Sequence, residues 1–195
     1  MNEFSATLEK VAKALENNSK RFEELDSAAG DGDLGITAGK IAEGIRSGIS
    51  LSTGDLKADL MMLGREISKS APSTFGTLFA TGFIRASGVV SNDCSALENV
   101  QKGFKAGFEG IAARGKASVG ERTLLDALAP ALTALNDASD LRSGLSSAAI
   151  AARGGAKATA AMMPRHGRAG WIGERAKGLE DAGANVIAVV FEALQ

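Results

Sequence analysis

The chain has 195 residues, with 22 Lys or Arg, 23 Asp or Glu and a formal net charge of −1. This balance of charges argues against electrostatic binding to nucleic acid or to an anionic membrane surface. A single cysteine excludes an internal disulfide framework, and the sequence shows neither a signal-peptide layout nor an apolar run of about 18 residues. We therefore expect one soluble, cytoplasmic domain over residues 1–195, long enough to bury a core of its own.

The dominant hydrophobic period in the first third of the chain is helical. Apolar residues recur at steps of three, four and seven residues between Phe4 and Leu25, which places them on one helix face. Isoleucines four residues apart predict a second helix around 41–49. A third helix follows Asp55, a good N-cap residue, and runs through Ile67.

Two capping boxes predict helix starts in the second half of the chain, one formed by Ser95 with Glu98 and one by Ser118 with Glu121. Pro130 should kink or end the second of these helices because proline lacks the N–H that an interior helical position donates.

The remaining segments are also predicted to be helical. The alanine-rich segment Leu145–Met163 predicts a helix that stops before Pro164. The final stretch "NVIAVVFEAL" is rich in β-branched residues, but no partner strand is indicated elsewhere, so a buried helix is favoured. We thus predict an all-α bundle of about eight helices joined by short loops, with mostly antiparallel neighbours.

The stretch "LDSAAGDGDLG" (residues 25–35) places Asp26, Asp31 and Asp33 close together in the sequence. Gly30 and Gly32 argue against an unbroken helix, and a turn there could bring the three carboxylates to one point. Carboxylate oxygens without His or Cys suit a hard cation such as Mg²⁺, which keeps coordination positions for water or phosphate oxygens. A solvated helix terminus with Asp33 as its N-cap explains the spacing equally well.

Three later segments could contact an anion. "SKSAPSTFGTLFATG" (68–82) predicts a turn and a helix N-terminus, which suits phosphate, although an ordinary Ser/Thr cap explains it too. Residues 113–128 and 163–185 are rich in glycine and basic residues, and Arg168 could neutralise phosphate charge, unless the second segment is simply a flexible basic surface loop. His166 has no second His or Cys partner, which argues against a metal-ligand role.

Taken together and in order, these segments resemble the L subunit (DhaL) of dihydroxyacetone kinases, the nucleotide-binding half of a two-part phosphotransferase. "LDSAAGDGDLG" is similar to the family's acidic metal loop, and "GERTLLDALAP" is similar to the start of its central helix. "GRAGWIGERAKGLEDAGA" matches a long pattern of GRA, an aromatic residue, GER and a closing acidic-x-Gly-Ala. The resemblance spans nearly the whole chain.

The resemblance implies an all-α barrel of eight antiparallel helices with a nucleotide bound at one rim. Asp26, Asp31 and Asp33 would ligate two Mg²⁺ ions that bridge the phosphates of ATP or ADP. The expected nucleotide-contacting residues are Leu34, Gly35, Ile36 and Thr37 beside the phosphates, Ser73, Thr74, Phe75 and Gly76 at the terminal phosphates, Gly115 and Leu124 beside the adenine, Arg168 on a phosphate, and Asp181, Ala182 and Gly183 closing the pocket.

The activity implied by the resemblance is phosphorylation of dihydroxyacetone or a similar short ketose, such as a tetrulose, together with a K-type subunit. That subunit would hold the sugar covalently on a histidine, and no catalytic residue is identified in this chain. One alternative is a subunit that keeps ADP tightly bound as a phosphoryl relay and is re-phosphorylated by a phosphotransferase-system phosphoprotein. Another alternative, from a different class, is a non-catalytic nucleotide-sensing regulatory module. The sequence leaves a homodimer open.

Three departures from the family pattern are evident. Leu34 stands where a histidine is usual, "APSTFG" replaces a Gly-Gly-x-Ser-Gly-like loop, and Trp171 stands where tyrosine is common. These changes leave the three aspartates intact but leave the substrate and the γ-phosphate geometry open. They suggest a divergent branch, for which a tetrulose is one candidate ketose.

Overall fold

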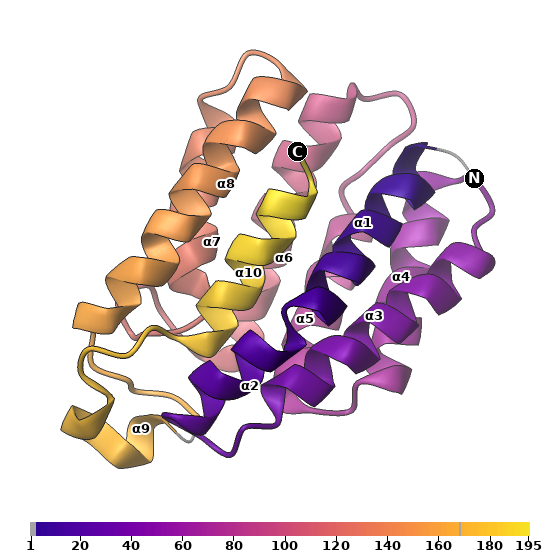
Figure 1. Ribbon diagram of the computed structural model, residues 1–195. Helices are drawn as coiled ribbons and strands as arrows, with labels where there is room; N and C mark the ends of the chain where they lie inside the picture. The colour runs from indigo at the N-terminus through magenta and orange to yellow at the C-terminus, as the bar shows by residue number, and fades with distance from the viewer. Residues whose placement is uncertain (1–2, 168) are drawn as a thin grey trace.

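The computed structural model describes residues 3–167 and 169–195, and all the regular elements among them are helical (Figure 1). None of the described helices is both long and apolar enough to cross a bilayer. The α-helices are α1 (Glu3–Asn17), α2 (Ser19–Ser27), α3 (Leu34–Ser50), α4 (Leu56–Ser70), α5 (Thr74–Ser87), α6 (Ala96–Gly115), α7 (Leu125–Asn136), α8 (Leu141–Ala158), α9 (Ala169–Ile172) and α10 (Ala182–Ala193), with 3₁₀ turns at Thr159–Ala161 and Gly173–Ala176.

Eight of the described helices have 12 or more residues, and they form a closed ring. Each packs against the next in the order α1, α3, α4, α5, α6, α7, α8 and α10, and α10 then packs against α1. Short α2 continues from α1 and lies against α3 and α10. The all-α antiparallel barrel expected from the sequence is therefore confirmed.

Helix α10 shows why the C-terminal stretch is not a strand. Its residues from Ala184 to Phe191 are all buried, as expected of a helix surrounded by others. The Phe191 ring stacks against Phe104 of α6 with centroids 4.8 Å apart. Contacts on several sides require an apolar surface all round the helix, and this explains the run of apolar residues from Val186 to Phe191.

The predicted helix starts are confirmed in two places. The Asp55 carboxylate accepts a hydrogen bond from the Ala58 N–H at 2.7 Å, and the Ser95–Glu98 capping box is complete. The long N-terminal helix is divided, because α1 ends at Asn17 and α2 begins at Ser19.

The helix start predicted at Ser118 is wrong, because α7 begins only at Leu125. Gly120 and Arg122 both have positive φ, of 92° and 59°, and this left-handed backbone is incompatible with a right-handed helix. Pro130 does not end the helix that follows, since α7 continues to Asn136.

Close helix packing in the barrel predicts opposite effects for two glycines of α3. A Cβ on Gly44 would lie 2.7 Å from the Ile67 Cα of α4, whereas a Cβ on Gly39 would meet no atom within 4 Å. We expect Gly44→Ala to lower the free energy of unfolding by about 1–3 kcal/mol. Gly39→Ala should raise it by about 0.5–1 kcal/mol through helix propensity. Urea denaturation measures both, and equal effects of the two substitutions would contradict this account of the packing.

Candidate functional site

Every second loop of the barrel lies at the same end of the molecule. Because neighbouring helices run in opposite directions, the segments 28–33, 71–73, 116–124 and 159–181 meet at the end where α9 lies (Figure 1). These are the loops of the four segments that carry the sequence motifs. The fold therefore gathers the predicted site residues that it describes around one rim.

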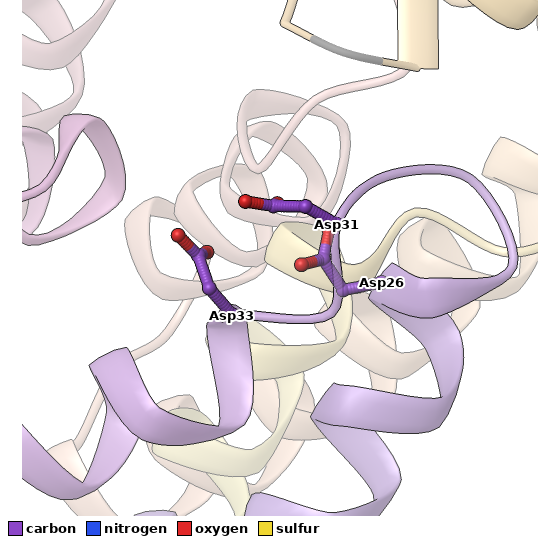
Figure 2. Close-up of side chains that lie close together, drawn as sticks. All are labelled: Asp26, Asp31 and Asp33. Carbon is purple, nitrogen blue, oxygen red and sulfur yellow. The ribbon is translucent and has the colours of Figure 1, made fainter.

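The acidic loop brings its three carboxylates together. Asp26 lies at the end of α2, Asp31 in the loop and Asp33 immediately before α3, and one carboxylate oxygen of each lies within 4.8 Å of the others (Figure 2). Gly32 permits the turn with a φ of +77°. Asp33 occupies the N-cap position of α3, but its side chain accepts no capping hydrogen bond. The predicted convergence is confirmed.

The electrostatics of this cluster favour a cation. Burial raises the pKa of Asp26 above its ordinary value, and the neighbouring charges of Asp31 and Asp33 raise it further, while a hydrogen bond from the Leu34 N–H opposes them. Clustered carboxylates repel one another unless a positive charge lies between them. An all-oxygen donor set of this kind fits Mg²⁺.

The residues expected beside the phosphates at the start of α3 divide into two groups. The Leu34 N–H donates to the Asp26 Oδ2 at 3.3 Å, and the Leu34 side chain is buried in the core. Gly35 packs against α2, since a Cβ there would lie 2.5 Å from the Ser19 carbonyl oxygen. Ile36, in contrast, is 65% exposed at the rim. The Leu34 side chain thus serves the core where the family pattern has a polar histidine.

The N-terminus of α5 lies beside the start of α3, which follows the acidic loop. The Thr37 Oγ1 is 3.5 Å from the Ser73 Oγ, and the Ser73 side chain caps α5 by accepting from the Gly76 N–H at 3.0 Å. A Cβ on Gly183 would lie 3.1 Å from the Phe75 ring, so the first turns of α5 and α10 are also adjacent. The positive end of a helix dipole at this position favours an anion.

A cavity of about 160 Å³ opens next to the start of α5. Gly115 and Leu124, the two residues expected beside an adenine, both line it, and Leu78, Ile111 and Leu125 contribute further apolar wall. The remaining lining residues are Thr74, Ala117, Thr123, His166 and Gly167. A mostly apolar wall with a few polar groups suits a flat heteroaromatic ring.

Two buried charged residues outside the predicted set of site residues, Arg122 and Asp126, hold the loop 116–124 in place. The Asp126 carboxylate, 3% exposed, accepts hydrogen bonds from the N–H groups of Gly120 and Thr123. Arg122, 2% exposed, donates from Nη2 to the Leu179 carbonyl oxygen at 2.9 Å, while its Nε and Nη1 have no hydrogen-bond partner among the described residues. The sequence signal that could have identified Arg122 and Asp126 is a pair of charged residues where a glycine-rich loop meets the start of an apolar helix.

The turn at 181–183, the last of the predicted site segments, begins α10. Its Asp181 is a second carboxyl group whose pKa is raised. Asp181 caps α10 by accepting from the Ala184 N–H at 2.7 Å, Ala182 is buried, and Gly183 faces Phe75. Burial raises the Asp181 pKa to about 6, with Asp126 and Asp26 contributing and the capping hydrogen bond and Arg122 opposing. Asp181 is thus electrostatically coupled to the acidic loop.

Two of the sequence expectations cannot be placed. Arg168, expected on a phosphate, lies outside the described residues, and the side chain of Trp171 is not among those described.

The sequence profile of the DAK2 domain matches residues 28–195. The chain is 31% identical over 188 residues to the PEP-dependent dihydroxyacetone kinase 1, ADP-binding subunit DhaL, of Listeria innocua, covering 96% of this chain and 91% of that subunit. It is 32% identical over 196 residues to L-erythrulose 1-kinase of Mycolicibacterium smegmatis, covering 97% of this chain and 34% of that protein.

Similar structures have been solved. The dihydroxyacetone kinase of Citrobacter freundii matches 100% of this chain with a TM-score of 0.80 and 27% identity, and the match covers 34% of that kinase chain. The same kinase in complex with AMP-PNP and Mg²⁺ matches equally well. This chain therefore spans nearly the whole of one bacterial subunit but about a third of the longer kinases.

The raised pKa of Asp181 predicts a pH-dependent stability difference. Because the pKa rises from 3.8 to about 6 on folding, this carboxyl stabilises the folded state below about pH 4, and that contribution is lost as the pH rises through about 6. Asp181→Asn keeps a capping side chain that cannot ionise. Between about pH 4.5 and about pH 7.5 we expect the difference in free energy of unfolding to shift in favour of the variant by up to about 2 kcal/mol. Urea denaturation without divalent cations measures it, and a difference independent of pH would refute the prediction.

Proposed function

The chain belongs to the DAK2 domain family, and on this premise we propose that it is the nucleotide- and Mg²⁺-binding subunit of a two-component kinase for dihydroxyacetone or a similar short ketose. The observation that carries the proposal is the convergence of three carboxylates with a helix N-terminus and an apolar cavity at one end of the barrel. Each of these features fits one part of a metal-bound nucleotide.

In this proposal Asp26, Asp31 and Asp33 hold two Mg²⁺ ions. Bound there, the ions would neutralise the phosphate charges that accumulate during phosphoryl transfer. The spread of at most 4.8 Å between the carboxylate oxygens and the absence of nitrogen or sulfur donors in this cluster support a hard cation.

The nucleotide lies, in the same proposal, from the acidic loop to the cavity. Ser73, Thr74, Phe75 and Gly76 at the N-terminus of α5 face the terminal phosphates, where the positive end of the helix dipole favours an anion. Gly35 and Thr37 line the phosphates beside the metals. Gly115 and Leu124 border the adenine, Arg168 contacts a phosphate, and the turn at 181–183 closes the site. Catalysis by this chain then consists of positioning and electrostatics.

The substrate would come from a separate K-type chain. This chain covers 91% of the Listeria innocua subunit, which is named for ADP binding, but a third of the L-erythrulose 1-kinase. The name of the Listeria innocua relative, an ADP-binding subunit of a kinase, supports a component that works with a separate ketose-binding subunit. We assign no proton-transfer residue to this chain.

The names of relatives of similar length favour a second candidate for the phosphoryl donor. The Listeria innocua subunit and the Escherichia coli one, which is 28% identical with 92% of its length covered, are both named as PEP-dependent and ADP-binding. In this second candidate mechanism, ADP stays bound to this chain as a phosphoryl relay. A phosphotransferase-system phosphoprotein re-phosphorylates the bound ADP.

Removal of one acidic-loop carboxylate tests the metal assignment. We expect Asp31→Asn to weaken Mg²⁺-dependent ADP binding at least about tenfold, because a carboxylate ligand and its charge are lost. Isothermal titration calorimetry with and without Mg²⁺ measures the effect. Asp137→Asn, an exposed aspartate at the far end of α7, is the matched control and should bind as the wild type does. Unchanged binding by Asp31→Asn would remove the metal assignment.

Reconstitution with the cognate K-type subunit tests the activity. We expect phosphorylation of dihydroxyacetone or erythrulose, with either ATP or a phosphotransferase-system phosphoprotein as donor. Rapid exchange of bound ADP for ATP would assign ATP as the donor, whereas ADP retained through extensive dialysis would assign the relay. No transfer from either donor to any short ketose, with both proteins folded, would refute the proposed function.

A further inference from the structure

One polar side chain in the wall of the cavity is not used by the proposed site. Among the residues that line the cavity, Thr74, Thr123 and His166 have polar side chains. The Thr123 hydroxyl is occupied, because it accepts a hydrogen bond from the Leu125 N–H at 3.2 Å. The His166 side chain lines the cavity and is 33% exposed, so the ring is in contact with both the cavity and solvent.

A rigidly held carboxylate fixes the His166 ring. The His166 Nε2 lies 2.6 Å from the Glu121 Oε2, and the same Glu121 oxygen accepts the Ser118 N–H at 2.7 Å. The Arg165 N–H also donates to the Glu121 carbonyl oxygen at 3.3 Å, so backbone and side chain both join the two loops. The hydrogen bond from Ser118 and then that from His166 hold the Glu121 pKa below its ordinary value. Glu121 is thus an ionised acceptor.

The Glu121 carboxylate decides which ring nitrogen remains for a ligand. An ionised carboxylate can only accept, so the His166 Nε2 carries the hydrogen that lies between them. In a neutral imidazole the other nitrogen, Nδ1, is then a hydrogen-bond acceptor. None of the described residues donates a hydrogen bond to it. A neutral His166 ring, which lines the mostly apolar cavity, therefore has Nδ1 as its acceptor.

We propose that His166 is a nucleoside-contacting residue, held in place by Glu121, whose Nδ1 accepts a hydrogen bond from the base or the ribose of the bound nucleotide. The inference rests on the proposed function, because it assigns the cavity to the nucleoside. A phosphate is the less suitable occupant, because the wall of the cavity is mainly apolar. The donor is an exocyclic amino group or a sugar hydroxyl, and both present the same chemistry to Nδ1.

The affinities for two ligands, ADP and inorganic pyrophosphate, distinguish the loss of a nucleoside contact from general damage to the site. ADP reaches both the metal cluster and the cavity, whereas inorganic pyrophosphate can occupy only the metal and phosphate positions. With Mg²⁺ present, we expect His166→Leu to weaken ADP binding about three- to tenfold and to leave pyrophosphate binding unchanged. His166→Asn, which returns an acceptor oxygen near the position of Nδ1, should recover part of the loss. Calorimetric titration measures both ligands, and thermal unfolding checks that each variant folds.

Arg165→Leu is the matched control. Arg165 neighbours His166 and pairs with the same Glu121 at 3.6 Å, yet it does not line the cavity and is largely exposed. We expect its ADP and pyrophosphate affinities to match those of the wild type. Comparison of ADP with inosine 5′-diphosphate and 2′-deoxyadenosine 5′-diphosphate then identifies the donor as the amino group or the ribose hydroxyl.

The outcomes distinguish this inference from the proposed function. Equal loss of ADP and pyrophosphate binding in His166→Leu, or no loss of either, would overturn the role of His166 while leaving the nucleotide site in place. A wild-type protein that binds neither ligand with Mg²⁺ would overturn the proposed function itself.

Discussion

Closure of the helix ring is the constraint on which the rest of this structure depends. Because α10 packs against both α8 and α1, the barrel has no open side, and neighbouring helices are held antiparallel all the way round. Antiparallel order places alternate loops at the same end. The acidic loop, the N-terminus of α5, the loop 116–124 and the segment 159–181 therefore meet without any of them being near another in sequence.

The rim assembled in this way places unlike environments next to one another. The loop that carries the three carboxylates leads into α3, whose Thr37 contacts Ser73 at the start of α5, and Thr74 of α5 lines the apolar cavity. A metal-bound nucleotide has the same succession of charge and apolar surface. The barrel places the loops at one rim, and the residues of the loops provide the charged and polar groups.

Buried charges hold this rim together where apolar packing does not. Asp126 ties down the backbone at Gly120 and Thr123, and Arg122 reaches the Leu179 carbonyl oxygen across the loops. The left-handed backbone at Arg122 is sterically costly for a residue with a Cβ and persists because its surroundings fix it. Arg122 and Asp126, two of the three buried charged residues in the described part of the chain, lie at this end of the molecule.

The sequence by itself determined the helical class, the caps at Asp55 and Ser95, the buried C-terminal helix and the acidic loop, because periodicity, capping and glycine turns act over a few residues. It misplaced the helix start at Ser118, where a local capping pattern competes with left-handed backbone and the carboxylate of Asp126. Only the tertiary structure decided that Leu34 faces the core and that Glu121 orients His166 at the cavity. Those roles depend on contacts between segments far apart in the chain, and no local pattern encodes them.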